Sequence, residues 1–309
     1  MSSSGSSKKP PIYRRRWFIV VVAIIVILLV VSLIPYAIPS PPLTAEQSEL
    51  NGAIAYLGES YNLTIGLVPQ VANGSTFVLY ADNYLVSLAA LRYSSTNQTT
   101  IDFAEAEYTA LMGYASTLPA ADSESAFTAL NSTLATFDCP ETYSLGWSPQ
   151  GSDASQAGSA TLMTVANDGS SSCASQNYGD LIFLQSLWWY KNGNQTEALK
   201  LFGEGASDFD GKGIVDLAYT DQNSSSYGVY QTSNLALFIY ATSCLGQSAN
   251  NPTFGGAVDT LMGLQDNSTG AFYVAYNSAL KPANTTVSTE ATALAMLALE
   301  RVNDPSSAC

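Results

Sequence analysis

Four polar residues stand at the starts of strongly apolar segments, and their side chains are the ones best suited to chemistry. Asp82 lies in YADNYL, Asp180 in NYGDLIF, Glu290 in VSTEAT, and Gln231 holds the same kind of place in VYQTSN. Carboxylates act as acids, bases or nucleophiles, and two of them about 5 or 6.5–9.5 Å apart support glycoside cleavage. The competing interpretation is helix capping, which favours the same residue types in a first turn. Asp82, Asp180 and Glu290 are therefore the candidate catalytic residues.

Aromatic side chains accompany these acids in the same loops and turns. Sugar C–H faces stack on aromatic rings while hydroxyl groups bond to acids and amides, so the combination is typical of carbohydrate sites. Trp188 and Trp189 lie inside an apolar segment, where core packing is the better explanation. The candidate ligand-binding residues are Tyr80, Tyr84, Trp147, Tyr178, Tyr230 and Gln231.

Missing residue types narrow the possible chemistry. The chain contains no histidine, which excludes Ser-His-Asp and Cys-His catalysis and histidine zinc sites within it. It also lacks a Cys-Xaa-Xaa-Cys pair, a Walker sequence and a Gly-Xaa-Ser-Xaa-Gly elbow. We therefore expect no cofactor and no metal, and we expect acid–base work to fall to carboxylates, tyrosine or lysine.

The segment DFDGKGIVD, residues 208–216, begins like a calcium-binding loop. Asp208, Asp210, Gly213 and Asp216 match positions one, three, six and nine of an EF-hand loop. Lys212 stands where a ligand is needed, and Tyr219 replaces the bidentate glutamate. The alternative, a tight glycine turn leading into a hairpin, fits better.

Two kinds of helix alternate along the chain. One kind carries a single apolar stripe, and the other is apolar on every side. In the one-stripe segment 101–115 we expect one face to point inward and the acidic face to point to water. The inward residues are Ile101, Ala104, Tyr108, Leu111 and Ala115, and the acids on the other face are Asp102, Glu105 and Glu107. The one-stripe segments are 45–56, 101–115, 195–207 and 252–264, and the apolar ones are 84–93, 181–190, 234–245 and 291–299.

This alternation predicts an outer layer of helices around an inner one, because a helix that is apolar all round must be covered on all sides. Each inner segment is too short for a membrane span, which needs about 20 apolar residues. An insertion at about 120–177 interrupts the second pair. In it LATFDCPETYSL and SATLMTVAND are predicted strands, and residues 123–134 a further helix.

Repeated helical hairpins with alternating inner and outer helices resemble the α/α toroids, the architecture of six-hairpin glycosidases and of terpenoid-cyclase or prenyltransferase-like folds. The resemblance covers about residues 45–303 and includes the phrases LMGLQDNSTGAFYVAY and STEATALAMLAL. It implies a mostly α domain of about four to five hairpins with short β-hairpin loops. An ordinary helical bundle or a solenoid is the alternative.

The N-terminus predicts a single membrane anchor. Residues 17–38 form an apolar run, preceded by a basic tail (1–16) and followed by a Pro-rich spacer (39–44) and the domain 45–309. The run is longer than the apolar part of a cleaved signal peptide, which is the competing interpretation. Basic residues stay cytoplasmic, so the domain is expected outside the cell as a single-pass protein of the cell membrane.

The residue types beyond the anchor agree with an exterior location. Five of the 11 basic residues precede it, which leaves six against 25 acidic residues, a net charge of −19 that disfavours nucleic acid. Four cysteines in an oxidising compartment suggest two disulfides, and the sequential pairing Cys139–Cys173 and Cys244–Cys309 is favoured. Asn-Xaa-Ser/Thr sequons, typical of archaeal surface glycoproteins, occur at Asn62, Asn73, Asn97, Asn131, Asn194, Asn223, Asn267 and Asn284.

These features together predict an anchored, glycan-directed protein of the cell envelope. The lipid bilayer is one expected partner and a glycan or polysaccharide the other. Two functions stay open: a carbohydrate-active enzyme (hydrolase, lyase or epimerase) that uses carboxylates and tyrosines, and a non-catalytic binding module or subunit of an envelope complex.

Overall fold

The computed structural model describes residues 44–63, 65–70, 77–93, 98–115, 141–146, 161–166, 179–216, 229–307 and 309. The chain divides into two units, Met1–Leu43 and Thr44–Cys309. The predicted tail, the anchor at 17–38 and all but the last residue of the spacer lie outside the described residues, as does the helix predicted at 123–134. Among the helices that the structure describes, none is both long and apolar enough to cross a membrane.

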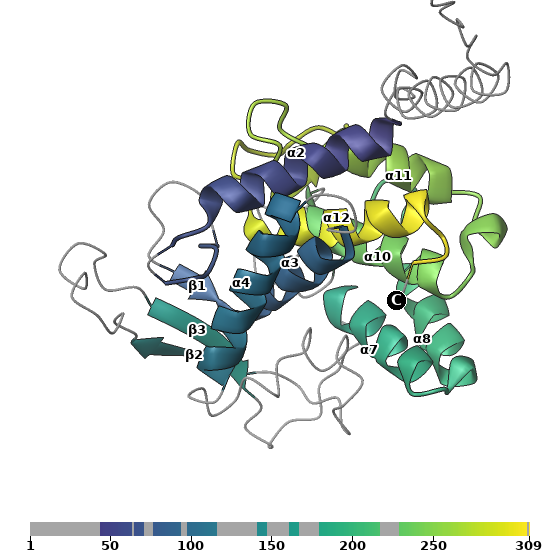
Figure 1. Cartoon of the computed structure of the whole chain (residues 1–309). Helices are drawn as coiled ribbons and strands as arrows, with labels where there is room; N and C mark the ends of the chain where they lie inside the picture. Colours follow the sequence, from purple (N-terminus) through teal and green to yellow (C-terminus); the bar gives the residue numbers. More distant parts are fainter. Residues whose placement is uncertain are drawn as a thin grey trace, which may run out of the picture. The chain divides into compact units, whose positions relative to one another are not determined.

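The described part of the second unit is mostly helical, with eight α-helices and short strands (Figure 1). The eight one-stripe and apolar helices predicted outside the insertion are all present, and most extend a few residues beyond the predicted bounds. They are α2 (Ala45–Ser60), α3 (Tyr80–Tyr93), α4 (Gln98–Ala115), α7 (Gly179–Lys191), α8 (Gln195–Ser207), α10 (Thr232–Cys244), α11 (Phe254–Met262) and α12 (Thr289–Asn303).

Burial separates these helices into the two kinds that the sequence predicts. In α10 every residue except Ser243 is buried, and in α12 Thr289 and all residues from 291 to 299 are buried. In α8 the buried residues are Ala198, Leu201, Phe202 and Gly205, which form one stripe. We call α3, α7, α10 and α12 the inner helices, and α2, α4, α8 and α11 the outer helices.

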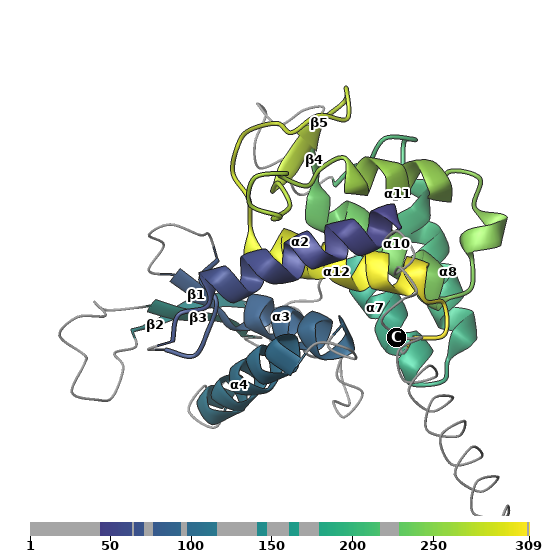
Figure 2. The same ribbon diagram turned by 45° about the horizontal axis from the view of Figure 1, so that its top comes forward.

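The inner helices pack in the order α3, α12, α10, α7, so the last helix of the chain lies against the first inner one. Each inner helix also carries an outer one: α4 packs on α3, α8 on α7, α11 on α10, and α2 on α12 (Figures 1 and 2). The layering therefore joins segments from both ends of the domain. Its stability depends on contacts between residues far apart in sequence.

The first turns of the inner helices lie at one end of this arrangement. The Asn83 amide in α3 accepts the N–H of Val68 at 2.7 Å and donates to the Val68 carbonyl at 3.0 Å. In the first turn of α12, Thr289 donates its hydroxyl to Pro69 O (2.5 Å) and its N–H to Gln70 O (3.0 Å). One short segment thus ties the starts of α3 and α12 together.

The last turns of the inner helices meet at the opposite end. Arg92, near the end of α3, donates to the Tyr240 hydroxyl in α10 and lies 5.7 Å from the centre of that ring. Burial lowers the pKa of Lys191 at the end of α7 to about 8, and the charge of Arg92 lowers it further. Burial raises the pKa of Glu300 in α12 to about 7, against the effect of Arg92. The first turns of the inner helices lie together at one end and their last turns at the other. The four inner helices therefore run in the same direction.

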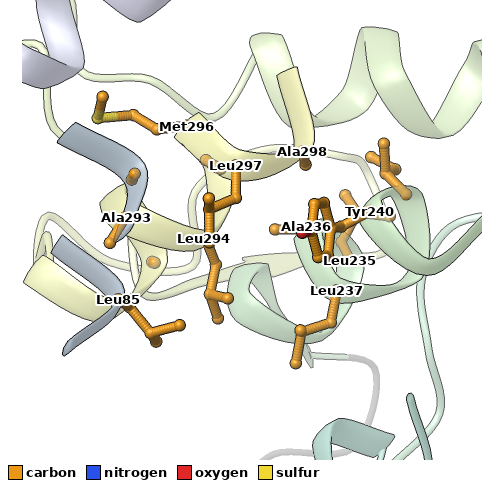
Figure 3. Close-up of a cluster of buried hydrophobic side chains, with 14 of the residues drawn as sticks. Leu85, Leu235, Ala236, Leu237, Tyr240, Ala293, Leu294, Met296, Leu297 and Ala298 are labelled. Carbon is orange, nitrogen blue, oxygen red and sulfur yellow. The ribbon is translucent and has the colours of Figure 1, made fainter. Parts of the chain in front are cut away.

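Aliphatic side chains of three inner helices form the centre of the core. Figure 3 shows Leu85 of α3, Leu294 and Leu297 of α12, and Leu235 and Leu237 of α10 in one cluster. All five are 3% exposed or less. Burying a leucine side chain contributes about 1.5–3 kcal/mol, so these contacts hold the inner helices in their shared direction.

Connections of unequal length follow from this arrangement. The outer helix α8 follows α7 after a tight turn at Gly193 (φ +81°), so the two are antiparallel neighbours. The long connections come before the inner helices in sequence, so each of them ends at the start of an inner helix. There β4 (Val229–Gln231) pairs antiparallel with β5 (Ala275–Asn277), and Tyr230 stands opposite Tyr276.

The strands predicted in the insertion are confirmed. Strands β2 (Glu141–Gly146) and β3 (Thr161–Ala166) pair antiparallel over six residues. Sequence reasoning missed their third partner, β1 (Phe77–Leu79), which pairs parallel with β3 directly before α3. The insertion is therefore attached to the start of an inner helix, in the sheet order β1-β3-β2.

One of the two expected disulfides is present. Cys244 at the end of α10 is bonded to Cys309, with their Cα atoms 5.7 Å apart and a sequence separation of 65. The bond joins the chain after α12 to the end of α10. The other expected pair, Cys139 and Cys173, lies outside the described residues.

The predicted inner face of α4 is wrong in part. Tyr108, expected to face inward, is 43% exposed, and Glu107, expected to face water, is completely buried. Ala104 and Leu111 are buried as expected. Glu107, Ala104 and Leu111 occur at i, i−3 and i+4, so a stripe through Glu107 fits the helical period as well as one through Tyr108. The prediction that Tyr108 faces inward was based only on its higher hydrophobicity.

Candidate active site at the starts of the inner helices

Asp180 and Glu290 begin two different inner helices and interact through their charges. Asp180 is in the first turn of α7 and Glu290 in the first turn of α12. Burial raises the pKa of Asp180 to about 6, although its carboxylate accepts the N–H of Leu181. Burial also raises the pKa of Glu290 to about 7, and the negative charge of Asp180 raises it further. The two carboxyl groups therefore form one coupled acidic pair.

Asp216 organises the region beside this pair. Its Oδ2 accepts the N–H of Gly179, the first residue of α7, at 3.2 Å, and the Nδ2 of Asn234 in the first turn of α10, also at 3.2 Å. Its negative charge also contributes to the raised pKa of Asp180. A single carboxylate thus connects the starts of α7 and α10.

A glycine is needed where α7 and α10 begin. A Cβ atom at position 179 would lie 2.9 Å from the Nδ2 of Asn234 and 2.9 Å from the Cγ2 of Ile214. Both contacts are shorter than carbon and nitrogen atoms tolerate. Gly179 therefore permits the close approach that brings Asp180 next to the start of α10.

Two buried polar atoms in the first turn of α10 accept no hydrogen bond from the residues that the structure describes. They are Asn234 Oδ1 and Thr232 Oγ1. Buried polar groups in proteins are nearly always bonded to protein, water or ligand. The start of α10, next to Asp216, therefore has unused capacity for hydrogen bonds, which a buried water molecule would satisfy.

Asp82, the third candidate acid, begins inner helix α3 at the same end and is 3% exposed. Its neighbour Asn83 holds the segment that also contacts Thr289 of α12. Asp82 thus shares the starting end with the other candidates, while the charge coupling described above is between Asp180 and Glu290.

The structure gives Tyr230 a supporting role. Its hydroxyl donates to Asp210 Oδ2 at 2.5 Å, its ring centre lies 5.3 Å from that of Tyr276, and only 7% of the residue is exposed. Tyr276 in turn donates to the carbonyl of Lys212 at 2.9 Å. Both tyrosines therefore hold the loop 208–216 against the β4–β5 pair. This use leaves Tyr230 little capacity to bind a ligand.

Tyr84 and Gln231, two candidate ligand-binding residues, differ in whether their side chains are already used within the protein. Tyr84 is buried, and its hydroxyl lies within range of Arg92, Tyr108 and Tyr240; burial, the first cause, raises its pKa to about 12. Gln231 stands at the N-cap of α10, where its side chain makes no capping hydrogen bond. Of the remaining aromatic candidates, Trp147 and Tyr178 lie outside the described residues, and the side chain of Tyr80 is not described.

The loop 208–216 is a glycine turn, as the alternative to a calcium loop predicted. Asp210 Oδ1 accepts the N–H groups of Lys212 (2.9 Å) and Gly213 (3.1 Å), and Gly211 has φ +90°. Phe209 and Ile214 form a bridge across the turn. Asp210 and Asp216 thus serve different partners, and no group of acids in the described ranges is arranged to hold a metal ion.

Sequence reasoning missed Asp216 and Asn234 as parts of this region. Asp216 was visible only as the last acid of a turn motif, and Asn234 only as the residue before LALFIY. A buried acid needs a partner, so an Asp at the end of an apolar pair such as Ile214–Val215 was an available signal.

The arrangement can perform acid–base chemistry near neutral pH. With pKa values of about 6 and about 7, one carboxyl of the pair is ionised while the other still holds a proton over part of that range. A protonated and an ionised carboxyl are the two groups that general acid–base catalysis requires. Comparisons of the chain with protein-family models, curated proteins and solved structures found no match.

Proposed function

We propose that the domain 44–309 is a carbohydrate-active enzyme in which Asp180 and Glu290 are the acid–base pair. The observation that carries this proposal is the charge interaction between two carboxyl groups in the first turns of different inner helices, each with a raised pKa. Perturbed carboxyl pairs of this kind concentrate at active sites.

Helix capping alone does not account for the pair. The N-terminus of a helix carries partial positive charge, which lowers the pKa of an acid placed there. In Asp180 the hydrogen bond from the Leu181 N–H acts in that direction, yet burial outweighs it.

The proposed reaction uses the two groups in opposite protonation states. Glu290, with the higher pKa, gives its proton to the glycosidic oxygen while the bond from this oxygen to the anomeric carbon breaks and its electron pair passes to the oxygen. Asp180, as a carboxylate, takes a proton from the water whose oxygen bonds to the anomeric carbon. A proton returned from Asp180 to Glu290 through solvent restores the starting state.

The proposal includes the architecture and the location expected from the sequence. An α/α toroid places the starts of parallel inner helices around one rim, and the contacts that join the starts of α3 with α12 and of α7 with α10 support this architecture. The Cys244–Cys309 disulfide supports an oxidising compartment. Asn194, Asn267 and Asn284 are exposed, so these sequons are accessible for glycosylation at the cell surface. Anchoring through residues 17–38 completes the proposal.

The test is bond cleavage by the full chain in lipid nanodiscs. The protein is incubated with a panel of polysaccharides between pH 4 and 8, and products are identified by mass spectrometry and by the anomer first released. We expect loss of at least about 100-fold in rate for Glu290→Gln and for Asp180→Asn. Glu105→Gln, which changes an exposed acid on α4, is the matched control.

Two outcomes would reject catalysis by this pair. Cleavage that survives both substitutions would place the chemistry elsewhere. Retention of a polysaccharide without cleavage, in the wild type and in both variants, would establish the alternative, a non-catalytic glycan-binding module.

A further inference from the structure

The two acids of the pair begin helices that are not packing neighbours. Asp180 is in the first turn of α7 and Glu290 in the first turn of α12, and α10 lies between these two helices in the packing order. The separation of the two carboxyl groups therefore depends on two connections at the starting end. One connection joins α12 to α10, and the other joins α10 to α7.

The residues directly before β5 connect the start of α12 to the start of α10, mainly through backbone atoms. The Phe272 carbonyl accepts the N–H of Ser288 at 3.2 Å, and the Phe272 N–H donates to the Thr292 hydroxyl at 3.0 Å. Two residues later, the Val274 carbonyl accepts the N–H of Thr232, the first residue of α10, at 3.0 Å. The first turn of α12 is thus held on both sides of its acid and tied to α10.

The connection between α10 and α7 depends on side chains instead. Asp216 Oδ2 accepts hydrogen bonds from the Gly179 N–H and from Asn234 Nδ2, both at 3.2 Å. Gly179 immediately precedes Asp180, so this bond fixes the point from which the Asp180 side chain extends. We call these two bonds to one carboxylate oxygen the Asp216–Asn234 bridge.

The amide of Asn234 is committed to this bridge. Asn234 is completely buried, and its Oδ1 accepts no hydrogen bond within the part of the chain that the structure describes. Its Nδ2 therefore makes the contact that decides where the start of α7 lies. Since the α12 side is held mainly by backbone atoms, the bridge is the connection that substitution of a side chain can release.

We propose that the Asp216–Asn234 bridge is a positioning element, which holds Asp180 at the separation from Glu290 that the acid–base reaction needs. This inference rests on the proposed function. Misplacing a catalytic group by about 1 Å can cost on the order of 100-fold in rate. The charge of Asp180 acts on Glu290 and weakens with distance, so the strength of this interaction reports the separation.

The test is a double-mutant cycle that measures the interaction of the two acids with and without the bridge. Urea unfolding of the full chain at pH 8 gives the stabilities of the wild type, Asp180→Asn, Glu290→Gln and the double variant. With pKa values of about 6 and about 7, both acids are largely ionised at this pH and repel each other. The two single variants together should therefore gain more stability than the double variant, and the excess is the interaction energy.

The same cycle is then repeated in the Asn234→Ala background. We expect the interaction energy to fall at least about twofold, because repulsion between the acids moves the released start of α7 outward. If Asn234→Ala fails to fold, Asn234→Leu, whose side chain has nearly the same shape as asparagine, takes its place. Cleavage is measured as well, and kcat should fall at least about tenfold with KM changed less than about threefold.

Two controls separate position from charge and from general stability. Asp216→Asn removes the negative charge but keeps an oxygen that accepts both hydrogen bonds, so the interaction energy should stay within about 30% of its wild-type value. Thr242→Val removes a buried hydrogen bond of 2.6 Å to the Phe238 carbonyl in the later part of α10. It should lower stability and leave the interaction energy unchanged, since it does not touch the start of the helix.

Two results would overturn the proposal. One is an unchanged interaction energy in folded protein that lacks the Asn234 amide. The other is an equal loss of interaction in Asp216→Asn, which would assign the effect to the charge of Asp216 and not to position. The absence of cleavage by the wild type would reject the proposed function alone, because the cycle measures the interaction of two charges and needs no substrate.

Discussion

Replacing Glu290 by glutamine should make the protein more stable at neutral pH. Burial and the charge of Asp180 raise the pKa of Glu290 from 4.5 to about 7. Below about pH 4.5 the group is protonated in both folded and unfolded chains, so its ionisation contributes nothing there. Between pH 4.5 and 7 the unfolded chain releases this proton first, and the folded state loses stability as the pH rises.

The magnitude follows from the size of the shift. Each pKa unit corresponds to about 1.4 kcal/mol, so the shift of Glu290 destabilises the folded state by about 3 kcal/mol at pH 8. Glutamine is uncharged at every pH and therefore resembles the protonated acid. We expect Glu290→Gln to match the wild type at pH 4 and to exceed it by about 3 kcal/mol at pH 8, or about 6–12 °C in melting temperature.

Urea unfolding at pH 4, 6 and 8, followed by circular dichroism, measures this difference. Glu105→Gln, which removes an exposed acid from α4, is the control and should change stability by less than about 0.5 kcal/mol at each pH. Equal stability of wild type and Glu290→Gln at pH 8 would refute the reasoning. So would a gain of the same size at pH 4, since that gain would come from packing and not from charge.

Three further predictions concern the parts that hold the site. Cys244→Ser opens a loop of 65 residues closed by Cys309 and should lower the free energy of unfolding by about 4 kcal/mol, measured by chemical denaturation; an unchanged midpoint would contradict this. Gly179→Ala places a methyl group 2.9 Å from Asn234 Nδ2 and should lower the free energy of unfolding by about 1–3 kcal/mol. It should also change the pH dependence of unfolding, because Asp180 is the next residue. A loss of stability with an unchanged pH dependence would contradict the second expectation. Tyr230→Phe removes a hydrogen bond to a carboxylate and should cost about 1.5–3 kcal/mol, and faster proteolysis within loop 208–216 should accompany the loss.

The raised pKa values also predict the conditions that suit the domain. Asp180, Glu290 and Glu300 all lie above their ordinary pKa values, chiefly because of burial. Each therefore holds its proton longer in the folded state, so the contribution of these three groups to stability is largest in acid and declines as they ionise. The raised pKa values of Asp180 and Glu290 thus reduce stability at neutral pH, as expected of the proposed acid–base pair.

The error in α4 shows where pattern reasoning is weakest. Tyr108 and Glu107 are neighbours, and either can lie on a face with Ala104 and Leu111. Hydrophobicity chose the tyrosine, because an acid without a partner is costly to bury. The structure buries Glu107 close to Tyr61, and burial raises its pKa well above the ordinary value. The energetic cost of this choice is visible only once the neighbouring turn is in place.

Local sequence was sufficient for the identity of the helices and for the layer each belongs to, because burial on one face or on all faces leaves a different hydrophobic period. It was also sufficient to place Asp180 and Glu290 in first turns, since caps and apolar runs are local signals. It could not decide which acids meet. That depends on α3, α12, α10 and α7 packing side by side in one direction, through contacts between segments as distant as Pro69 and Thr289. Only this long-range packing brings Asp180, Glu290 and Asp216 into one region and excludes enough water to shift the pKa values of the acid pair.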